Sequence, residues 1–296
     1  MMNQADISLS SATVEQARTM LAQAADLAGD EPVDVANVED VTIDAEHADI
    51  PARVYAPEGA DGLPTLVYYH GGGFVIGDLD THDNLCRLLA DRADAVVISV
   101  DYRLAPEHPF PAAVKDAYAA AKWASGNAET YGGDGSRLAV AGDSAGGTLS
   151  AVVSLMARDR GLPRIDAQCL FYPATAYMEP MESRAQNAEG YFLEAGDLMW
   201  FVDKYIGDEI DARHPYAMPL QVRSTEDTPP AMVVTCEFDP LRDEGQAYAD
   251  RLEADGVPVE RVHYDGMIHG FLNMEGLVDR AYDAVDAVAD FLDEQV

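Results

Sequence analysis

Positive charge is scarce in this chain of 296 residues, which carries 19 lysines and arginines against 53 aspartates and glutamates. Only three of the basic residues are lysines, Lys115, Lys122 and Lys204, and the net charge is −34. A surface this acidic repels the phosphates of nucleic acids and of anionic lipids. We therefore expect no nucleic-acid partner and no membrane partner.

Repulsion among the acidic groups also opposes the compact state when little salt is present. Salt shortens the screening length from ~8 Å at physiological ionic strength to ~3 Å at 1 M. The composition resembles that of proteins from haloarchaea and other halophiles that accumulate salt, which implies a halophilic protein whose fold is more stable at molar salt. The alternative is an acidic enzyme from a mesophile.

Cysteine is rare as well. Cys86, Cys169 and Cys236 lie far apart and have no metal-ligand spacing, so we expect no disulfide framework and no metal site. Cys169 and Cys236 lie in apolar runs and are expected to be buried. No apolar stretch is long enough to span a bilayer, and polar residues 1–11 show no signal peptide, so we expect a cytoplasmic protein.

Short apolar runs alternate with helical patterns along most of the chain. Residues 10–28 are expected to form an amphipathic helix, and helices are also expected over 79–92, 112–125 and 241–255 and at the C-terminal end. The last helix is expected to bury Leu277, Ala281, Val285, Val288 and Leu292. Residues 131–135 are expected to turn, and three prolines exclude regular structure over 104–111. Eight runs have the pattern of short strands: Val41–Asp44, Arg53–Ala56, Thr65–Tyr69, Val96–Val100, Leu138–Ala141, Gln168–Tyr172, Ala231–Thr235 and Val259–Tyr264.

This alternation predicts an α/β fold with a mainly parallel sheet and helices on both faces. Residues 180–222 interrupt it, because they contain a helical apolar stripe but no strand pattern. We expect this segment to be an insertion that packs with the N-terminal helix.

A serine stands on a predicted tight turn between strand and helix. The strand Leu138–Ala141 leads into Gly142-Asp143-Ser144-Ala145-Gly146, and an apolar helical face follows. The two glycines allow strand and helix to approach closely, and the turn then presents Ser144 at the carboxyl end of the sheet. A glycine-rich loop without function is the alternative.

A serine nucleophile needs a base, usually a histidine that a carboxylate orients. Asp239 follows the seventh predicted strand and His269 follows the eighth, in the chain order that this fold requires. Asp243 is a rival acid, but it falls within the next helix, and Asp239 could instead cap that helix. His263 is a rival base within a strand; the remaining histidines outside the glycine motif, His47, His82, His108 and His214, lie in polar or proline-flanked segments.

Acyl transfer also requires donors for the oxyanion, each worth roughly 2.7–4 kcal/mol. The run His70-Gly71-Gly72-Gly73 leaves the third predicted strand, and its glycines allow backbone N–H groups to turn inward. The N–H of Ala145 is the expected second source of donors.

Together these motifs resemble the hormone-sensitive-lipase family of α/β-hydrolases, the bacterial and archaeal family IV esterases. The similar segments are His70–Phe74, Tyr102–Ala112, Gly142–Gly147, Asp239–Asp243 and His269–Phe271, and the Gly-Asp-Ser-Ala-Gly form is similar to one subgroup. The resemblance implies an α/β-hydrolase fold, a mostly parallel eight-stranded sheet with a helical cap. Residues 1–40 would form the N-terminal part of the cap and 41–296 the catalytic domain, with a cap insertion at about 180–222.

The resemblance also implies roles for individual residues. Ser144 would be the nucleophile, His269 the general base and acid, and Asp239 the orienting carboxylate. The N–H groups of Gly72, Gly73 and Ala145 would form the oxyanion hole, with His70 and Gly71 supporting that loop. Candidate substrate-binding residues are Phe74, Asp143, Phe192, Leu198, Phe201 and Ile268, with Met181 and Met199 as further walls of the pocket.

The predicted function is that of a serine carboxylesterase for short- to medium-chain esters, acting through an acyl-enzyme without a cofactor. An amidase, deacetylase or lactone hydrolase would use the same triad. A small-molecule receptor on this fold is disfavoured, because it usually lacks a member of the triad. The resemblance further implies a homodimer that forms through the edge strand near Val259–Tyr264.

Overall fold

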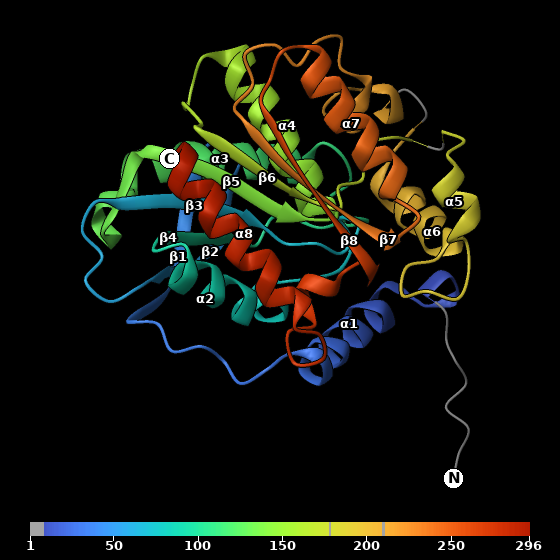
Figure 1. Ribbon diagram of the computed structural model, residues 1–296, viewed down its shortest axis with the longest axis horizontal. Helices are drawn as coiled ribbons and strands as arrows, with labels where there is room; N and C mark the ends of the chain where they lie inside the picture. The colour runs from blue at the N-terminus through green and yellow to red at the C-terminus, as the bar shows by residue number, and fades with distance from the viewer. Residues whose placement is uncertain (1–8, 178, 209–210) are drawn as a thin grey trace.

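A single eight-stranded sheet runs through the computed structural model, which describes residues 9–177, 179–208 and 211–296 (Figure 1). The strand order is β1-β2-β4-β3-β5-β6-β7-β8. The strands are β1 (Asn37–Ala45), β2 (Ala48–Ala56), β3 (Leu63–Tyr69), β4 (Val96–Val100), β5 (Gly133–Asp143), β6 (Ala167–Phe171), β7 (Ala231–Phe238) and β8 (Val259–Ile268).

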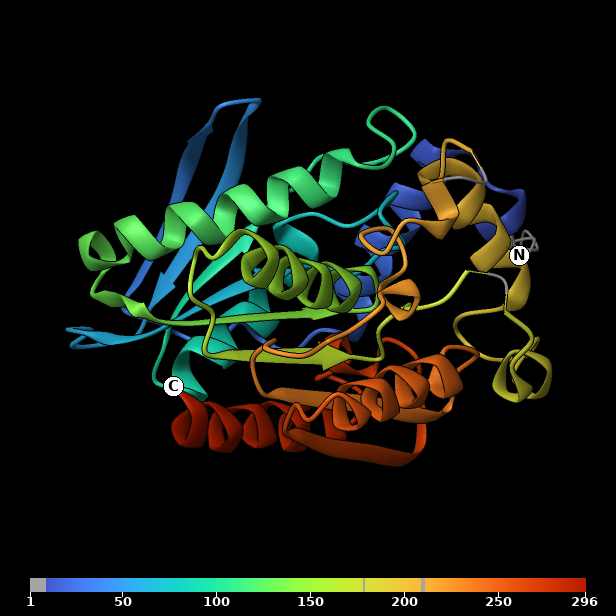
Figure 2. The same cartoon turned by 90° about the horizontal axis from the view of Figure 1, so that it is seen from above.

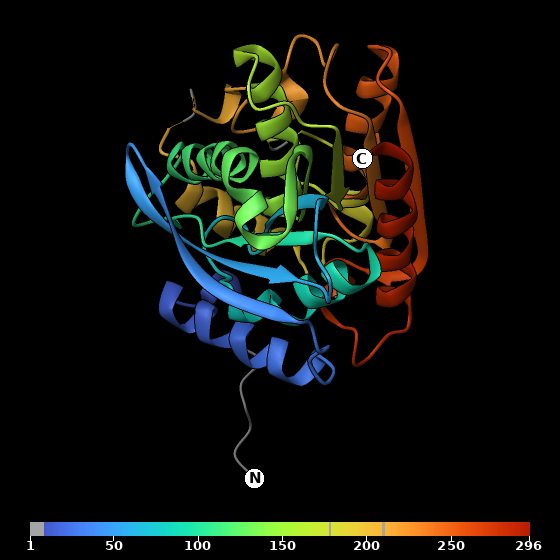
Figure 3. The ribbon, with the colours of Figure 1, turned by 90° about the vertical axis from the view of Figure 1, so that its left-hand side faces the viewer.

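The sheet is mostly parallel, as predicted. Strands β3 to β8 pair in parallel, whereas β2 pairs antiparallel with both β1 and β4. Figure 3 looks onto the edge of the sheet that β1 and β2 form. The opposite edge strand, β8, pairs only with β7 among the described residues, and dimerisation through β8 stays a prediction.

Helices cover both faces, which explains why every residue of β4 and β6 is buried. The helices α3 (Ala112–Asn127), α4 (Ala145–Arg160) and α7 (Arg242–Ala254) pack on one face. The helices α2 (Asp83–Arg92) and α8 (Arg280–Gln295) pack together on the other. Figure 2 shows α3 and α8 on opposite sides of the sheet.

The remaining helices gather at the end of the sheet toward which the central parallel strands point (Figure 2). They are α1 (Val14–Ala28), α5 (Glu182–Gln186) and α6 (Ala195–Tyr205). As predicted, residues 180–222 contain no strand in their described part, and they pack against the N-terminal segment. The indole N–H of Trp200 donates to the carbonyl of Ala12 at 3.2 Å, and Asp197 accepts from the amide of Ser10 at 3.1 Å.

Three details of the predicted pattern were wrong. Gly133–Gly135 do not turn but begin β5, because β3 offers pairing partners as far back as Leu63. β8 continues through Asp265 and Gly266 to Ile268, and the Asp-Gly pair is accommodated where the pairing with β7 shifts register. Leu277, predicted to be buried in the last helix, precedes α8 and is 66% exposed.

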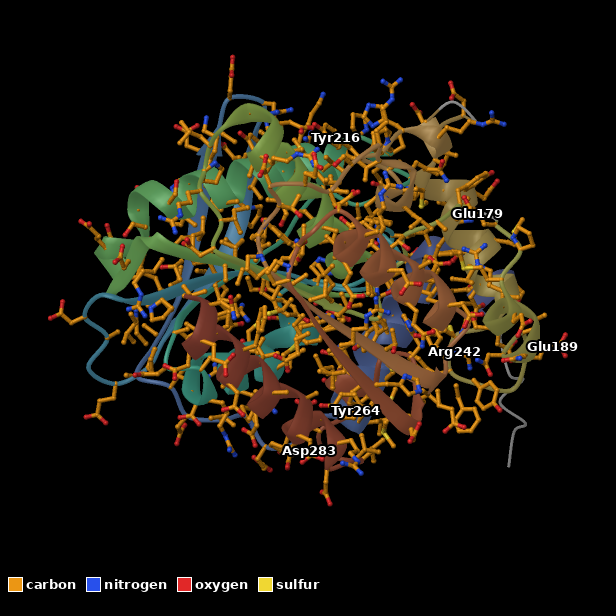
Figure 4. The ribbon with its side chains drawn as sticks, turned by 45° about the horizontal axis from the view of Figure 1, so that its top comes forward. Glu179, Glu189, Tyr216, Arg242, Tyr264 and Asp283 are labelled. Atoms are coloured by element: carbon orange, nitrogen blue, oxygen red, sulfur yellow. The ribbon has the colours of Figure 1, made fainter. Side chains whose placement is uncertain are left out.

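In Figure 4, the acidic residues Glu189, which follows α5, and Asp283 on α8 lie at the periphery of the molecule. All three cysteines are buried and unpaired. Among the described residues, no helix is long and apolar enough to cross a membrane, and no three His, Cys, Asp or Glu side chains are grouped to hold a metal ion.

Candidate active site

Ser144 stands at the turn from β5 into α4 in a backbone conformation that is strained for a residue with a side chain, with φ of 54°. The neighbouring glycines are sterically required. A Cβ on Gly146 would lie only 1.7 Å from the carbonyl oxygen of Tyr69, and one on Gly142 would lie 2.4 Å from the same atom. The turn places Ser144 at the N-terminus of α4, where the helix dipole is positive.

His269 follows directly after β8 and reaches the serine. Its Nε2 lies 2.9 Å from Ser144 Oγ, and its Nδ1 lies 2.9 Å from Asp239 Oδ2. His269 is 6% exposed, and its ring packs beside that of Tyr172, with ring centroids 4.7 Å apart. The imidazole therefore bridges the hydroxyl and the carboxylate, although the three residues are far apart in the sequence.

Asp239 is fully buried after β7, and each of its oxygens has a separate partner. Oδ2 faces His269, while Oδ1 accepts from the backbone N–H of Leu241 at 2.8 Å. The amide of Asn187, from the inserted segment, donates to the backbone carbonyl of Asp239 at 3.1 Å. Asp239 does not cap α7, since Leu241 is the N-cap of that helix, but its bond from the N–H of Leu241 closes the turn that precedes the helix.

The rival residues are engaged elsewhere. Asp243 accepts from the N–H of Ser183 and from its neighbour Arg242. His263 lies beside the hydroxyl of Thr235 at 2.9 Å. Neither takes part in the contacts of Ser144 or His269 described above.

The glycine run after β3 forms a tight loop beside the serine. Gly72 and Gly73 have positive φ of 109° and 58°, and a Cβ on Gly73 would lie 2.3 Å from the ring of Phe201. In the part of the chain that the structure describes, no hydrogen bond is donated by the N–H groups of Gly72, Gly73 or Ala145. These three amides are therefore free to bind a ligand oxygen.

His70, the residue before the glycine run, contacts this loop through its side chain. Its Nδ1 lies 2.7 Å from the carbonyl oxygen of Gly71, and its ring stacks on Tyr102 with centroids 4.3 Å apart. Burial and the neighbouring His82 lower the pKa of His70 to about 4, so the ring is neutral at pH 7. The contacts agree with a supporting role for His70.

A cavity of about 590 Å³ opens over Ser144 and His269. The N–H-bearing residues Gly72, Gly73 and Ala145 line it, as do all the candidate substrate-binding residues, Phe74, Asp143, Phe192, Leu198, Phe201 and Ile268. Met181 and Met199 do not line it, which corrects that expectation. Met199 lies on the outer side of α6 and is 50% exposed.

The sequence analysis missed one whole wall of the cavity. Apolar residues of α1 form it, namely Ala17, Met20, Leu21, Ala24, Ala25, Leu27 and Ala28. Their helical stripe was recognisable in the sequence, but an apolar stripe looks the same whether it faces a core or a cavity. Leu27 at the end of this wall is 81% exposed.

Arg18 anchors α1 over the cavity. Its guanidinium donates to the carbonyls of Val75 and Ala105 and makes two 2.8 Å bonds with Glu107. At the other end of α1, the N–H of Gly276 donates to the carbonyl of Ala28 at 2.9 Å. The helix is thus fixed at both ends across the site.

Comparison with known proteins agrees with this architecture. A model of the alpha/beta hydrolase fold family matches residues 66–273. Esterase LipI of Mycobacterium tuberculosis is 45% identical over 255 residues, which are 84% of this chain and 79% of LipI. Ethyl acetate hydrolase of Pseudomonas putida is 37% identical over 271 residues, 90% of this chain and 85% of that enzyme.

A solved structure extends the similarity to nearly the whole chain. The esterase of Pyrobaculum calidifontis superimposes with a TM-score of 0.91 at 44% sequence identity. The match covers 96% of this chain and 94% of that one.

Proposed function

The chain belongs to the alpha/beta hydrolase family, and we propose that it is a serine carboxylesterase that cleaves short- to medium-chain esters through an acyl-enzyme. The observation that carries the proposal is the continuous contact from Asp239 through His269 to Ser144, with 2.9 Å at each step, at the floor of an apolar cavity. The esterases among its relatives support the same reaction class.

In this mechanism Ser144 Oγ attacks the ester carbonyl while His269 Nε2 takes its proton. Asp239 keeps the Nδ1–H of the imidazole directed at itself, so that Nε2 is free to accept. The imidazolium then protonates the departing alkoxide, and the alcohol leaves. A water molecule, deprotonated by the same histidine, attacks the acyl-serine, and the histidine passes this proton to Ser144 Oγ as the carboxylic acid leaves.

The oxyanion of each tetrahedral intermediate would be bound by the N–H groups of Gly72, Gly73 and Ala145. These amides have no other acceptor among the described residues, and Ala145 is the first residue of α4, where the helix dipole favours negative charge. The positive φ of both glycines is the conformation that turns this loop, and the Phe201 ring against Gly73 leaves no room for a side chain.

The size and lining of the cavity support small apolar substrates. Its volume of about 590 Å³ lies in the range of small-molecule sites, and aliphatic and aromatic side chains form most of its wall. We further propose that residues 1–40, in the part that the structure describes, and the insertion at about 180–222 together constitute a cap over the catalytic domain, residues 41–296.

The direct test is hydrolysis of p-nitrophenyl butyrate by the wild type and by Ser144→Ala. The variant should lose turnover because the covalent route is gone, whereas Ser125→Ala, a serine on α3 whose hydroxyl donates only to Lys122, should keep it. A melting curve for each variant verifies folding. Wild-type protein without esterase activity, or Ser144→Ala with substantial turnover, would refute the proposal. The amide p-nitrobutyranilide is assayed alongside, and its faster hydrolysis would indicate an amidase instead.

A further inference from the structure

Three segments, namely β3 and two 3₁₀ turns, contact the side chain of Asp143, the residue that precedes Ser144. This carboxylate is 4% exposed, at the end of β5. The hydroxyl of Tyr68 on β3 donates to Oδ1 at 2.7 Å, and the amide of Asn273 donates to Oδ2 at 3.3 Å. The Nε2 atom of His82 lies 3.4 Å from Oδ1.

One of these contacts leads to the loop of the proposed oxyanion hole. The backbone N–H of Gly71 donates to His82 Nε2 at 3.3 Å, so the imidazole lies between the carboxylate and the loop. The carboxylate also lies close against Gly71, and a side chain at that position would clash with it, because a Cβ on Gly71 would lie 2.3 Å from Asp143 Oδ2. The position of this loop is therefore set against the Asp143 side chain.

A second contact leads to the loop of the proposed base. Asn273 lies four residues after His269, in the single 3₁₀ turn Phe271–Asn273. Its backbone N–H donates to the carbonyl of Gly270 at 3.2 Å, while its side chain reaches Asp143. The turn therefore connects the carboxylate to the backbone next to the imidazole.

The carboxylate is ionised in this setting. Burial opposes its charge, but His82 and the hydrogen bond from Tyr68 outweigh burial and hold the pKa of Asp143 below its usual value. Hydrogen bonds to a charged acceptor are stronger than those between neutral groups. A buried anion that accepts from Tyr68 and Asn273 and lies against His82 is suited to hold the three segments that carry these residues in one relative position.

We propose that Asp143, through Asn273 and His82, is a positioning residue that holds the base and the oxyanion loop in register with Ser144. The inference rests on the proposed esterase function. It assigns Asp143 a role distinct from substrate binding, because Tyr68 and Asn273 already occupy its two oxygens. Loss of the Asp143 carboxylate, or of its link to Asn273, should therefore destabilise the transition state and leave ground-state binding of the ester nearly unchanged.

The decisive variant is Asn273→Ala, which removes the link to the His269 loop and keeps the carboxylate. A misplacement of reacting groups by a fraction of an ångström to 1 Å lowers rates by ~10- to 100-fold, so we expect kcat for p-nitrophenyl butyrate to fall by ~10-fold or more. KM should stay within about twofold, as for an interaction that matters only in the transition state. The rates are divided by the concentration of reactive Ser144, which is measured by titration with a fluorophosphonate. Misfolded protein therefore does not lower the measured kcat.

Asn84→Ala is the matched control. Its amide also donates to a carboxylate of the same loop, Glu275 at 2.7 Å, but not to Asp143. This variant should lose stability and keep kcat within about twofold, because neither bond lost, to Glu275 or from the N–H of Val33, involves Asp143. Asp143→Asn is the second test; it keeps the shape but puts an NH₂ group against one of the two donors, and should reduce kcat at least as much as Asn273→Ala.

The outcomes are distinct. If the wild type does not hydrolyse the ester, the proposed function itself fails. If it does, and Asn273→Ala has the kcat of Asn84→Ala, the positioning role is wrong. A rise in KM at unchanged kcat in Asn273→Ala or Asp143→Asn would instead assign Asp143 to substrate binding and also overturn the inference. Should Asp143→Asn fail to fold, Asn273→Ala still decides.

Discussion

Replacing Asp239 by asparagine should stop catalysis while leaving the fold almost intact. The side-chain carbonyl of the asparagine can keep the 2.8 Å bond from the N–H of Leu241. Its NH₂ group then faces His269 Nδ1, which lies 2.9 Å from Oδ2 in the present structure. Because NH₂ is a donor, Nδ1 must accept, and the ring proton moves to Nε2, where it blocks proton transfer from Ser144.

The expected loss follows from this change of tautomer. Where an asparagine misorients a catalytic histidine in this way, kcat falls by about 10⁴, or ~5 kcal/mol of transition-state stabilisation. Stability should change little for Asp239→Asn. Asp239→Ala should lose a further ~1–3 kcal/mol in the free energy of unfolding, because the N–H of Leu241 is then left without an acceptor in the interior.

The assay is steady-state hydrolysis of p-nitrophenyl butyrate, with urea unfolding of each variant. Asp243→Asn is the control, since Asp243 accepts from Ser183 and Arg242 and contacts neither His269 nor Ser144. The control should keep kcat within about twofold. An Asp239→Asn enzyme that retained more than about a tenth of kcat would refute the reasoning on the tautomer.

Three further predictions concern the surface, the cavity and the oxyanion loop. The melting temperature should rise from low salt to about 3 M KCl, because salt screens the repulsion of a chain with net charge −34; an unchanged melting temperature would remove the halophile hypothesis. Leu21→Trp should narrow the cavity at the wall that α1 forms, and should lower kcat/KM for octanoate esters more than for acetate esters. An equal loss of kcat/KM for all acyl chain lengths would contradict this. The pKa of His70 is about 4 in the native state against ~6.5 unfolded, so the unfolded chain binds more protons between these values. The free energy of unfolding should therefore fall as pH drops from about 6.5 toward 4, and urea titrations should find a smaller fall in His70→Asn; an identical pH dependence would count against the buried neutral imidazole.

The residues of the candidate triad could be found from the sequence for a physical reason. In a parallel sheet the loops at the carboxyl ends of the strands meet at one edge. Ser144, Asp239 and His269 each follow a predicted strand within a few residues, and the structure brings them within hydrogen-bond distance. The steric need for glycine at positions 142 and 146 was likewise implied by the spacing, since only residues without a side chain allow so close an approach.

The environment of the triad could not be found in this way. The contacts of Asp143 with Tyr68, His82 and Asn273 join residues up to 130 positions apart, and no local pattern marks them. The direction in which α1 presents its apolar stripe depends on the anchor that Arg18 makes with Glu107 and two carbonyls far along the chain. The continuation of β8 beyond Tyr264 was not predicted, because the register shift that accommodates Asp265-Gly266 depends on the partner strand β7.

The central claim is that Ser144 becomes acylated by the ester. The most direct measurement is to treat the protein with a p-nitrophenyl phosphonate, which leaves a stable adduct on a nucleophilic serine, and to locate the adduct by peptide mass spectrometry. The account predicts a single modified residue, Ser144, with loss of activity in proportion to labelling and no labelling in Ser144→Ala. An adduct on another residue that accompanies the loss of activity, or full activity with Ser144 labelled, would contradict it.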